Sequence, residues 1–451
     1  MPPSSQNPRQ LALIALRDVY QRGAYTDIAL DRVLRKANIS SADRGLTCEL
    51  VYGIVRRQRS LDTLIDGLGK KKATQQPPLL RIILHIGLYQ LRYLSQIPAS
   101  AAVNTSVELA KENGLKNLRG VVNALLRQYT RLAATETDPL NLPQDPVKRL
   151  GVLYSFPDWI IENWQQELGL EETEQLCKWF NQPPTIDLRV NRLRSSIEEV
   201  KAALASRGIA VSSIPHLPQA LRISGGAGSI QNLPGFREGW WTVQDSSAQL
   251  VSHFLAPQPE EVIIDVTAAP GGKTTHIAEI MGDRGTIWAI DRSSKRLERL
   301  KENAKRLQLR SIQVCAGDSR SLSRFNQIAD RVLLDAPCSG NGTLHRHPDI
   351  RWRQTPKKIE ELALLQKQLL ESSATMVKSE GTLVYATCTL NRIENEKVIF
   401  SFLDRHPNWF IELPSPDSAA AIFTDPQGLI KVWPHRQQMD GFFMVKLKKE
   451  L

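Results

Sequence analysis

Residues 263–275 read I-I-D-V-T-A-A-P-G-G-K-T-T, and the fold of the chain is decided here. The stretch opens with a β-branched apolar run, which predicts a buried strand. The run breaks at Pro270, Gly271 and Gly272, and a helix is expected from about Thr274. Glycines at such a corner let backbone amides approach a ligand closely, and the helix N-terminus adds partial positive charge. The stretch therefore predicts a strand–turn–helix corner that holds a ligand.

The sequence of the corner does not match the motifs of two common phosphate-binding sites. A P-loop needs G-x-x-x-x-G-K-[ST], and Thr267 stands where its first glycine should be. The dinucleotide motif G-x-G-x-x-G is also absent. Asp291 closes a second expected strand, 286–290, 20 residues beyond Gly271, a spacing at which a carboxylate accepts hydrogen bonds from a ribose. S-adenosylmethionine fits such a nucleoside-binding turn, while glycines with a purely structural role are the open alternative.

Strands and helices alternate along the whole of residues 239–451. The expected strands are 262–266, 286–290, 312–315, 331–334, 382–386 and 441–447, and the expected helices include 295–307 and 359–377. This alternation predicts a Rossmann-like α/β domain with a doubly wound, mainly parallel sheet. Its ligand is expected beyond the carboxyl ends of the strands.

Two further domains are expected before this one. Residues 1–132 show helical periodicity throughout and predict an all-α domain. Residues 133–146 have the composition of a linker. Residues 147–238 begin with helices and continue as strands around one helix, a small α+β module that is consistent with a ferredoxin-like RNA-binding fold.

The excess of positive charge lies entirely in the N-terminal third. Residues 1–132 contain 20 Lys and Arg against 9 Asp and Glu, a balance of +11 that equals the net charge of the whole chain. A surface of this kind attracts RNA or DNA, although a basic domain without a nucleic-acid partner is the alternative. The basic groups that we expect to contact phosphates are Arg56, Arg57, Arg59, Lys70, Lys71, Lys72, Arg119, Arg127 and Arg131.

Composition favours a cytoplasmic protein. The first residues lack an apolar signal core, and the most apolar stretch, 79–91, is interrupted by Arg81 and His85. We therefore expect neither secretion nor a membrane span. The five cysteines are an odd number without a C-x-x-C pair, which argues for free thiols and against a disulfide framework or a zinc ribbon.

Two of the cysteines follow predicted strands of the α/β domain. Cys338 lies in D-A-P-C-S-G and Cys388 in V-Y-A-T-C-T-L, so both should open onto the same crevice as the corner at 270–273. A free cysteine is more often a small buried residue, and this reading is kept for Cys48, Cys177 and Cys315. Because both Cys338 and Cys388 are expected at the ligand edge of the sheet, we predict a catalytic role for this pair instead.

Acidic and basic residues accompany the two thiols. Asp318 ends the third strand and could reach an adenine amino group, and Asp335 ends the fourth and points toward the substrate; either could instead cap the next helix. His345 and His347 indicate a metal only weakly, and we expect none. The loop around them is expected to be a flexible, phosphate-facing lid; its basic residues are Arg346, Arg351, Arg353, Lys357 and Lys358.

Five motifs in order carry a resemblance to a known family. They are A-A-P-G-G-K-T, D-R-S-S-K-R-L, G-D-S, D-A-P-C-S-G-N-G-T and A-T-C-T-L-N-R-I-E-N-E, followed by P-H-R-Q-Q-M-D-G-F-F-M-V-K-L near the end. This set resembles the RNA (cytosine-5) methyltransferases of the NOP2/Sun type, and the N-terminal third resembles the NusB RNA-binding domain. The combination is similar to bacterial enzymes that methylate 16S ribosomal RNA. Thr267 is a departure, because relatives often have Cys there.

The resemblance implies roles for individual residues. It assigns nucleophilic attack on cytosine C6 to Cys388 and product release to Cys338, as a base or through one. Asp335 would bind the N3/N4 edge of the base, with Lys273 nearby. The cofactor-binding residues implied are Thr267, Ala268, Ala269, Pro270, Gly271, Gly272, Lys273, Asp291, Asp318 and Asp335. Because C6 is shielded in a stacked base, the target must be unpaired or flipped.

These observations predict an S-adenosylmethionine-dependent, monomeric, cytoplasmic enzyme that makes 5-methylcytosine in 16S ribosomal RNA. A tRNA cytosine-5 methyltransferase has the same chemistry and is one alternative. A non-catalytic RNA-binding or transcription factor that retained the fold is another, although the intact cysteine pair argues against it. A protein or DNA methyltransferase suits the basic helical domain and the two cysteines less well.

Overall fold

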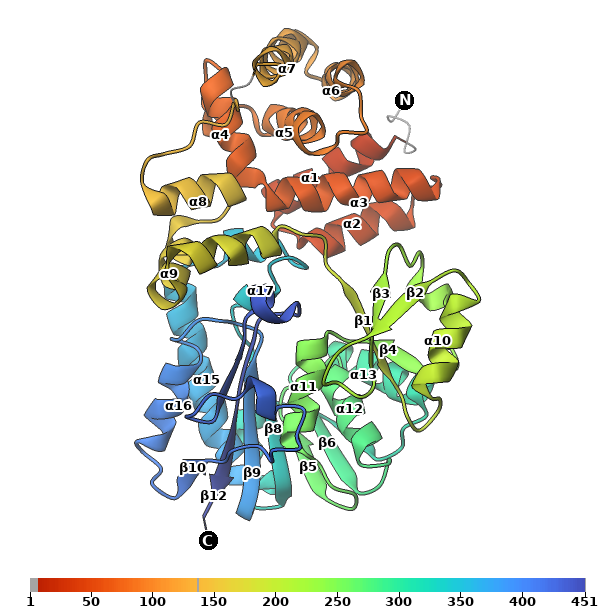
Figure 1. Cartoon of the computed structure of the whole chain (residues 1–451), viewed down its shortest axis with the longest axis vertical. Helices are drawn as coiled ribbons and strands as arrows, with labels where there is room; N and C mark the ends of the chain where they lie inside the picture. Colours follow the sequence, from red (N-terminus) through yellow and green to blue (C-terminus); the bar gives the residue numbers. More distant parts are fainter. Residues whose placement is uncertain (1–6, 136–137, 451) are drawn as a thin grey trace. The chain divides into compact units, whose positions relative to one another are not determined.

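The structure, a computed structural model, describes residues 7–135 and 138–450 and divides into two compact units (Figure 1). The first unit runs to Gln182 and also includes residues 344–353, and the second holds the remainder. Residues 136 and 137 of the expected linker lie outside the described residues. The domain boundaries expected at 132, 146 and 238 stay predictions.

The first unit is helical, as the periodicity predicts. Its helices are α1 (Pro8–Arg22), α2 (Thr26–Arg35), α3 (Ser41–Arg56), α4 (Gln58–Leu68), α5 (Pro78–Tyr93), α6 (Ala99–Glu112), α7 (Arg119–Ala133), α8 (Pro146–Tyr154), α9 (Asp158–Phe180) and α14 (Ile350–Arg353). Helix α5 is buried from Leu80 to Gln90 except at Arg81, because α1, α3, α4, α6 and α7 pack around it. A helix that is apolar on all sides is stable only in such a central position.

The expected phosphate-facing lid is wrong at Arg351. Its side chain is fully buried in the helical unit, where Nη1 donates to the carbonyl of Ser155 at 3.0 Å and the guanidinium lies 3.9 Å from the centre of the Phe156 ring. Arg353 donates to the carbonyl of Gly23 at 2.9 Å. Both arginines therefore anchor the segment 344–353 within the unit, and Arg351 is not available to a phosphate.

Eight of the nine basic residues expected to contact phosphates fall into two groups, and the ninth, Arg57, is half-buried with its guanidinium 5.0 Å from the centre of the Tyr93 ring. Arg56 is buried and donates to the carbonyl of His345 at 3.0 Å, and Arg59 pairs with Asp158 at 2.6 Å, so their expected role as phosphate contacts is wrong for Arg56 and weakened for Arg59. The second group stays exposed on α7 and on the turn after α4. It consists of Lys70, Lys71, Lys72, Arg119, Arg127 and Arg131.

The second unit begins with a small antiparallel sheet. Its strands are β1 (Ile186–Val190), β2 (Ala210–Ser213), β3 (Ala220–Ser224) and β4 (Trp241–Val243), in the order β2-β3-β1-β4. Helix α10 (Ile197–Ala205) buries Val200 and Leu204 in the same cluster as Leu188 and Trp241. The strands and the helix form the ferredoxin-like α+β module that residues 147–238 predict, and β4, which lies beyond residue 238, adds an edge strand to it.

The larger sheet has eight strands in the order β10-β12-β9-β8-β5-β6-β7, with β11 paired to β12. They are β5 (Val262–Asp265), β6 (Thr286–Asp291), β7 (Ile312–Ala316), β8 (Ala329–Asp335), β9 (Val377–Thr387), β10 (Trp409–Ile411), β11 (Leu429–Val432) and β12 (Phe442–Lys449). Strands β5 to β9 are parallel to their neighbours among themselves, and β12 is antiparallel to β9, β10 and β11. This is the mainly parallel sheet that the alternation predicts.

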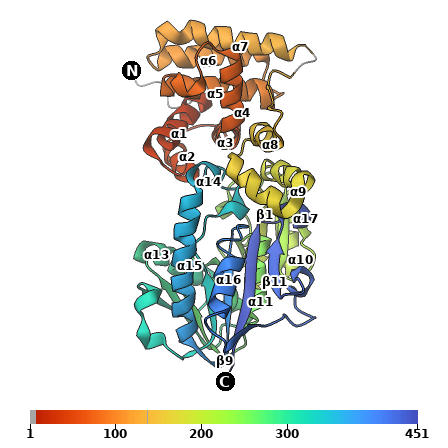
Figure 2. The same cartoon turned by 90° about the vertical axis from the view of Figure 1, so that its left-hand side faces the viewer.

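Both faces of this sheet are covered by helices (Figure 2). Ile263 packs with α11 (Ser246–Leu255) and α12 (Gly272–Ile280), and the next residue, Ile264, packs with α15 (Pro356–Met376) and α16 (Glu396–Leu403). Alternation along a strand thus explains the continuous apolar run at 262–264. Strand order reverses at β5, where β6 and β8 flank it, and such a switch point leaves a crevice at the carboxyl ends of the strands.

Candidate functional site

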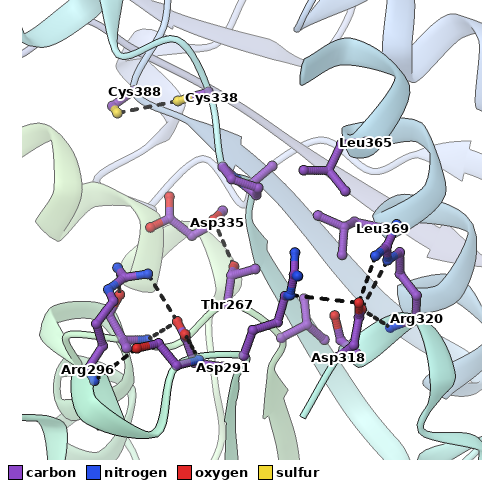
Figure 3. A pocket seen from close by; sticks show the side chains of 17 residues that line it. Thr267, Asp291, Arg296, Asp318, Arg320, Asp335, Cys338, Leu365, Leu369 and Cys388 are labelled. Atoms are coloured by element: carbon purple, nitrogen blue, oxygen red, sulfur yellow. Dashed lines mark hydrogen bonds and ion pairs between the residues drawn. The ribbon is translucent and has the colours of Figure 1, made fainter. Parts of the chain in front are cut away.

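A cavity of about 560 Å³ opens at the carboxyl ends of β5, β6, β7, β8 and β9 (Figure 3). This volume is within the range of small-molecule sites. It is lined by Val266, Thr267, Ala269, Asp291, Arg292, Ser293, Arg296, Asp318, Ser319, Arg320, Asp335, Ala336, Pro337, Cys338, Leu365, Leu369 and Cys388. The expected residues Ala268, Pro270, Gly271, Gly272 and Lys273 form the adjoining corner without lining the cavity.

The corner between β5 and α12 requires glycine at position 271. Gly271 has a φ of +102°, and a Cβ there would lie 2.6 Å from Cγ of Leu300 on α13 (Ser294–Leu307). One backbone and one side-chain hydrogen bond fix the corner on its two sides: Ala268 N donates to the Ile290 carbonyl at 2.8 Å, and Thr267 Oγ1 donates to the Asp335 carbonyl at 2.7 Å. The predicted turn is therefore held between β6 and β8.

Asp265 supports the corner from inside, and sequence reasoning did not single it out. Its buried carboxylate accepts a hydrogen bond from Thr274 Oγ1 at 2.7 Å. Burial raises the pKa of Asp265 to about 7, although the bond from Thr274 opposes this. An Asp at the last position of an otherwise apolar strand was the signal that could have found it.

One end of the cavity carries two carboxylates. Asp291 accepts hydrogen bonds from Ser293 N at 2.8 Å and Ala269 N at 3.2 Å, and Arg296 lies 3.4 Å away. Asp318 caps the short helix that follows β7 and pairs with Arg320 at 2.7 Å, which lowers the pKa of Asp318 to about 2. Asp318 thus combines the capping role with a place on the cavity wall. Arg296 lies within the motif D-R-S-S-K-R-L and Arg320 directly follows G-D-S, but the sequence reasoning singled out neither.

The composition of this end fits a nucleoside. Carboxylates at the ends of β6 and β7 are acceptors for hydroxyl and amino groups, and Leu365 and Leu369 from α15 form an apolar wall opposite (Figure 3). Residues that would hold the ribose and base of S-adenosylmethionine are therefore present.

The other end of the cavity carries the two thiols (Figure 3). The Sγ atoms of Cys338 and Cys388 lie 3.4 Å apart. The hydrogen bond from the Cys338 thiol lowers the pKa of Cys388, and the Lys273 cation adds to this, against the effects of burial and of Asp335. The same hydrogen bond raises the pKa of Cys338. The pair is thus polarised, with Cys388 the easier of the two to deprotonate.

Lys273 and Asp335 form an ion pair beside the thiols. Lys273 Nζ lies 2.6 Å from Asp335 Oδ2 and 5.0 Å from the centre of the Phe442 ring. Burial alone would lower the pKa of Lys273, but the pairing with Asp335 raises it overall. The structure therefore brings together all four residues that the sequence singled out for chemistry, namely Lys273, Asp335, Cys338 and Cys388.

Two of the remaining cysteines and one of the two histidines considered for a metal lie in packed surroundings. Cys177 and Cys315 are buried, the latter within β7, and His345 packs 4.3 Å from the Trp179 ring in the helical unit. Within residues 7–135 and 138–450, no group of three or more His, Cys, Asp or Glu side chains could hold a metal ion. Over the same residues, no helix combines the length and the apolar character that crossing a membrane requires.

Three family models match the chain in succession. Residues 6–131 match the NusB family, residues 156–229 match the ferredoxin-like domain of RsmF/B-like methyltransferases, and residues 252–448 match the 16S rRNA methyltransferase RsmB/F model. A protein of Synechocystis named "Probable ribosomal RNA small subunit methyltransferase B" is 53% identical over 98% of this chain and 99% of its own length. The chain belongs to the RsmB/F family of methyltransferases.

Solved structures agree with this membership. The crystal structure of PH0851 is 30% identical, with a TM-score of 0.80 over 98% of this chain and 99% of its own. NSun6 from Pyrococcus horikoshii, solved with the S-adenosylmethionine analogue SFG, is 26% identical with a TM-score of 0.60, over 66% of this chain and 99% of its own. The predicted fold class and the prediction of a methyltransferase are confirmed. The roles of the individual site residues stay predictions.

Proposed function

We propose that this RsmB/F-family enzyme transfers a methyl group from S-adenosylmethionine to C5 of a cytosine in 16S ribosomal RNA, through a covalent bond between Cys388 and C6. One observation carries the proposal: a polarised thiol pair lies at the end of a nucleoside-sized cavity, next to a Lys–Asp ion pair. Cytosine C5 is a poor nucleophile, so a methyltransferase acting there needs such a thiol. Relatives named as small-subunit ribosomal RNA methyltransferases support the choice of RNA.

The first step belongs to Cys388. Its thiolate adds to C6 of the base, and the electron pair of the C5–C6 double bond becomes available at C5, with negative charge spread toward N3. Lys273 stabilises this charge, and Asp335 binds the N3/N4 edge of the base. Bound S-adenosylmethionine supplies an electrophilic methyl group, which C5 then takes.

The second step belongs to Cys338. When Sγ of Cys388 bonds to carbon it loses its negative charge, and the largest cause of the raised pKa of Cys338 disappears. Cys338 can then release its own proton to solvent in the cavity, and the resulting thiolate accepts the C5 proton, directly or through a water molecule. The C5–H electron pair restores the double bond, and Cys388 leaves as a thiolate.

The cofactor would lie toward the opposite end of the cavity. Asp291 accepts hydrogen bonds from the ribose hydroxyls, and Asp318 accepts one from the adenine amino group. Thr267 to Lys273 form the corner beneath it. Arg296, which donates to the carbonyl of Ala269 and lies beside Asp291, holds the two parts of this end together.

RNA would be drawn to the helical unit by its exposed basic residues, Lys70 to Lys72 on one turn and Arg119, Arg127 and Arg131 along α7. The five cysteines are all free, which supports a reducing cytoplasm as the place of action.

Nucleoside analysis after incubation with RNA tests the proposal. We expect the wild-type enzyme and S-adenosylmethionine to produce 5-methylcytidine in 16S ribosomal RNA, and Cys388→Ala to produce none while it still binds the cofactor. Modification of tRNA in place of 16S RNA would favour the alternative substrate. Methylation by Cys388→Ala at near the wild-type rate would overturn the assignment of the nucleophile.

A further inference from the structure

Glu394 is a carboxylate sealed inside the second unit among neutral hydrogen-bond donors. The residue has no exposed surface, and it lies in the loop between β9 and α16. Burial raises the pKa of Glu394, while hydrogen bonds from Ser339 oppose the rise. Burying a carboxylate is costly, and a sealed one requires several hydrogen bonds to persist. The groups that donate hydrogen bonds to the Glu394 carboxylate indicate its role.

These donors come from the two turns that contain Cys338 and Cys388, which we call the cysteine turns. Ser339, which follows Cys338, donates its backbone N–H to Oε1 at 2.8 Å and its hydroxyl to Oε2 at 2.5 Å. Thr389, which follows Cys388, donates its hydroxyl to Oε2 at 3.3 Å. The Ser339 and Thr389 hydroxyls also lie 2.9 Å apart. One side chain therefore bridges the residues next to both thiols.

Neighbouring side chains hold the bridge in place. Gln366 on α15 donates through Nε2 to Oε1 of Glu394 at 3.0 Å and to the carbonyl of Pro337 at 2.9 Å, so it supports the Cys338 turn from the other side. Asn395 donates to the carbonyl of Thr389 at 3.0 Å and accepts from the Thr387 hydroxyl at 2.6 Å, which fixes the turn around Cys388. The Tyr385 hydroxyl donates to the Glu394 carbonyl at 2.6 Å.

We propose that Glu394 is a positioning residue that ties the two cysteine turns together and so sets the separation of the two thiols. The inference rests on the proposed roles of Cys338 and Cys388. Glu394 does not line the cavity, and it acts only through Ser339 and Thr389. The 3.4 Å contact that polarises the thiol pair depends on it.

Glu394 also contributes charge to the thiols. The charged groups that face Cys388 are Lys273 from α12, Asp335 from the end of β8, and Glu394. Lys273 favours the thiolate, and the two carboxylates disfavour it. A change at Glu394 thus has two effects, one on geometry and one on charge, and two substitutions separate them.

Glu394→Gln keeps the bridge and removes the charge. Oε1 receives two N–H groups that only donate, so the amide oxygen of glutamine would take that side. Oε2 faces two hydroxyls, which also accept hydrogen bonds, so the amide nitrogen can donate to them. Glu394→Ala removes the bridge as well as the charge. Glu396→Gln is the matched control, because Glu396 lies on the same segment and pairs with Lys431 at 2.9 Å.

The experiment measures how fast iodoacetamide alkylates Cys388 as a function of pH, by mass spectrometry, alongside kcat for methylation. The account predicts that Glu394→Gln moves the alkylation midpoint to lower pH, because a carboxylate is lost. Glu394→Ala moves it to higher pH, because the Cys338 hydrogen bond is lost, and lowers kcat about 100-fold, the cost of roughly 1 Å of misplacement. The kcat of Glu394→Gln lies between those of Glu394→Ala and the wild type. Glu396→Gln changes neither kcat nor the alkylation midpoint.

Midpoints that stay at the wild-type value in both Glu394 variants would overturn the proposal, as would shifts in the same direction. If Glu394→Ala does not fold, Thr389→Val takes its place, because it removes the hydroxyl that joins the Cys388 turn to Glu394 and Ser339: a midpoint at the wild-type pH in that variant overturns the proposal. Alkylation requires neither RNA nor a methyl donor. Failure of the proposed methylation chemistry would therefore appear separately, as methylation by Cys388→Ala.

Discussion

The two ends of the cavity differ in how far solvent reaches their cations, because Arg292 and Arg296 at one end are more than half exposed and Lys273 at the other is not. At the cofactor end, the Asp318 side chain is 29% exposed and pairs with arginines that are themselves exposed. At the thiol end, the Lys273 side chain is only 13% exposed, although its partner Asp335 is 31% exposed, and the buried carboxylate of Glu394 lies behind the thiols. Exposed ion pairs contribute little and reorganise easily, whereas enclosed charges alter reactivity strongly. This difference supports our proposal that one end binds the cofactor and the other carries out the reaction.

The largest expected effect tests the reacting end. Cys388→Ala removes the nucleophile, and turnover should fall by about 10⁴-fold or more. The dissociation constant for S-adenosylmethionine, measured by calorimetry, should stay within about twofold of wild type, because the residues proposed to bind the nucleoside part of the cofactor lie at the end of the cavity opposite Cys388. A large loss of cofactor affinity would show that the two ends are not separable.

Cys338→Ala tests whether the two thiols have different roles in the reaction. If Cys338 releases the product, attack by Cys388 still occurs and a protein–RNA adduct accumulates. Denaturing gels of the variant with RNA and cofactor should show this slower band, and wild type should show little of it. Absence of the band, with slow but complete turnover, would leave Cys338 with only its effect on the pKa of Cys388.

A substitution at the binding end should affect the KM for the cofactor and leave kcat nearly unchanged. Asp291→Asn removes a charged acceptor of the ribose hydroxyls, a loss of about 1.5–3 kcal/mol, which raises the KM for S-adenosylmethionine by about 10- to 100-fold. The kcat at saturating cofactor should change little. Steady-state kinetics over a range of cofactor concentrations measures both values, and a loss confined to kcat would contradict the division.

A pH profile probes the polarised thiols directly. The pKa of Cys388 is lowered by the Cys338 hydrogen bond, so the thiolate fraction, and with it kcat/KM for RNA, should rise with pH and level off below the pH at which an ordinary cysteine titrates. Cys338→Ala removes the hydrogen-bond donor to Cys388 and should therefore shift the rise of the Cys388 alkylation rate to higher pH. An unchanged profile would mean that the contact between the sulfurs does not polarise them.

The smallest effect concerns the helical unit. Arg127→Ala and Arg131→Ala change exposed residues on α7, and each should weaken RNA binding modestly and reduce the slope of log affinity against log salt by about 1. Fluorescence anisotropy at several salt concentrations measures this. Arg56→Ala is the contrasting control, because Arg56 is buried: its effect should appear in thermal stability and leave the salt slope unchanged.

The same contrast explains what the sequence could and could not predict. Asp291, Asp318, Asp335 and both thiols were predictable, because each follows a strand and the carboxyl ends of parallel strands meet at one edge. Arg351 and Arg56 were misjudged, because their acceptors are backbone carbonyls far away in the chain, at Ser155 and His345. Charge patterns mark a residue as exposed unless such a partner is known.

Glu394 shows the same limit at the reacting end. Its position in the motif was quoted, but its function depends on Ser339, 55 residues earlier, and on Gln366 in a helix between them. No local pattern marks a carboxylate whose partners are neutral and distant. Asp265 was missed for a related reason, because its raised pKa follows from burial that only the folded sheet creates.

The covalent bond between Cys388 and cytosine is the central claim, and mass spectrometry of trapped enzyme tests it most directly. RNA that contains 5-fluorocytosine cannot release a C5 proton, so the adduct should persist after methyl transfer. The account predicts a peptide in which Cys388 carries the modified nucleotide, absent from Cys388→Ala. A nucleotide attached to Cys338, or methylated RNA with no attached peptide, would contradict it.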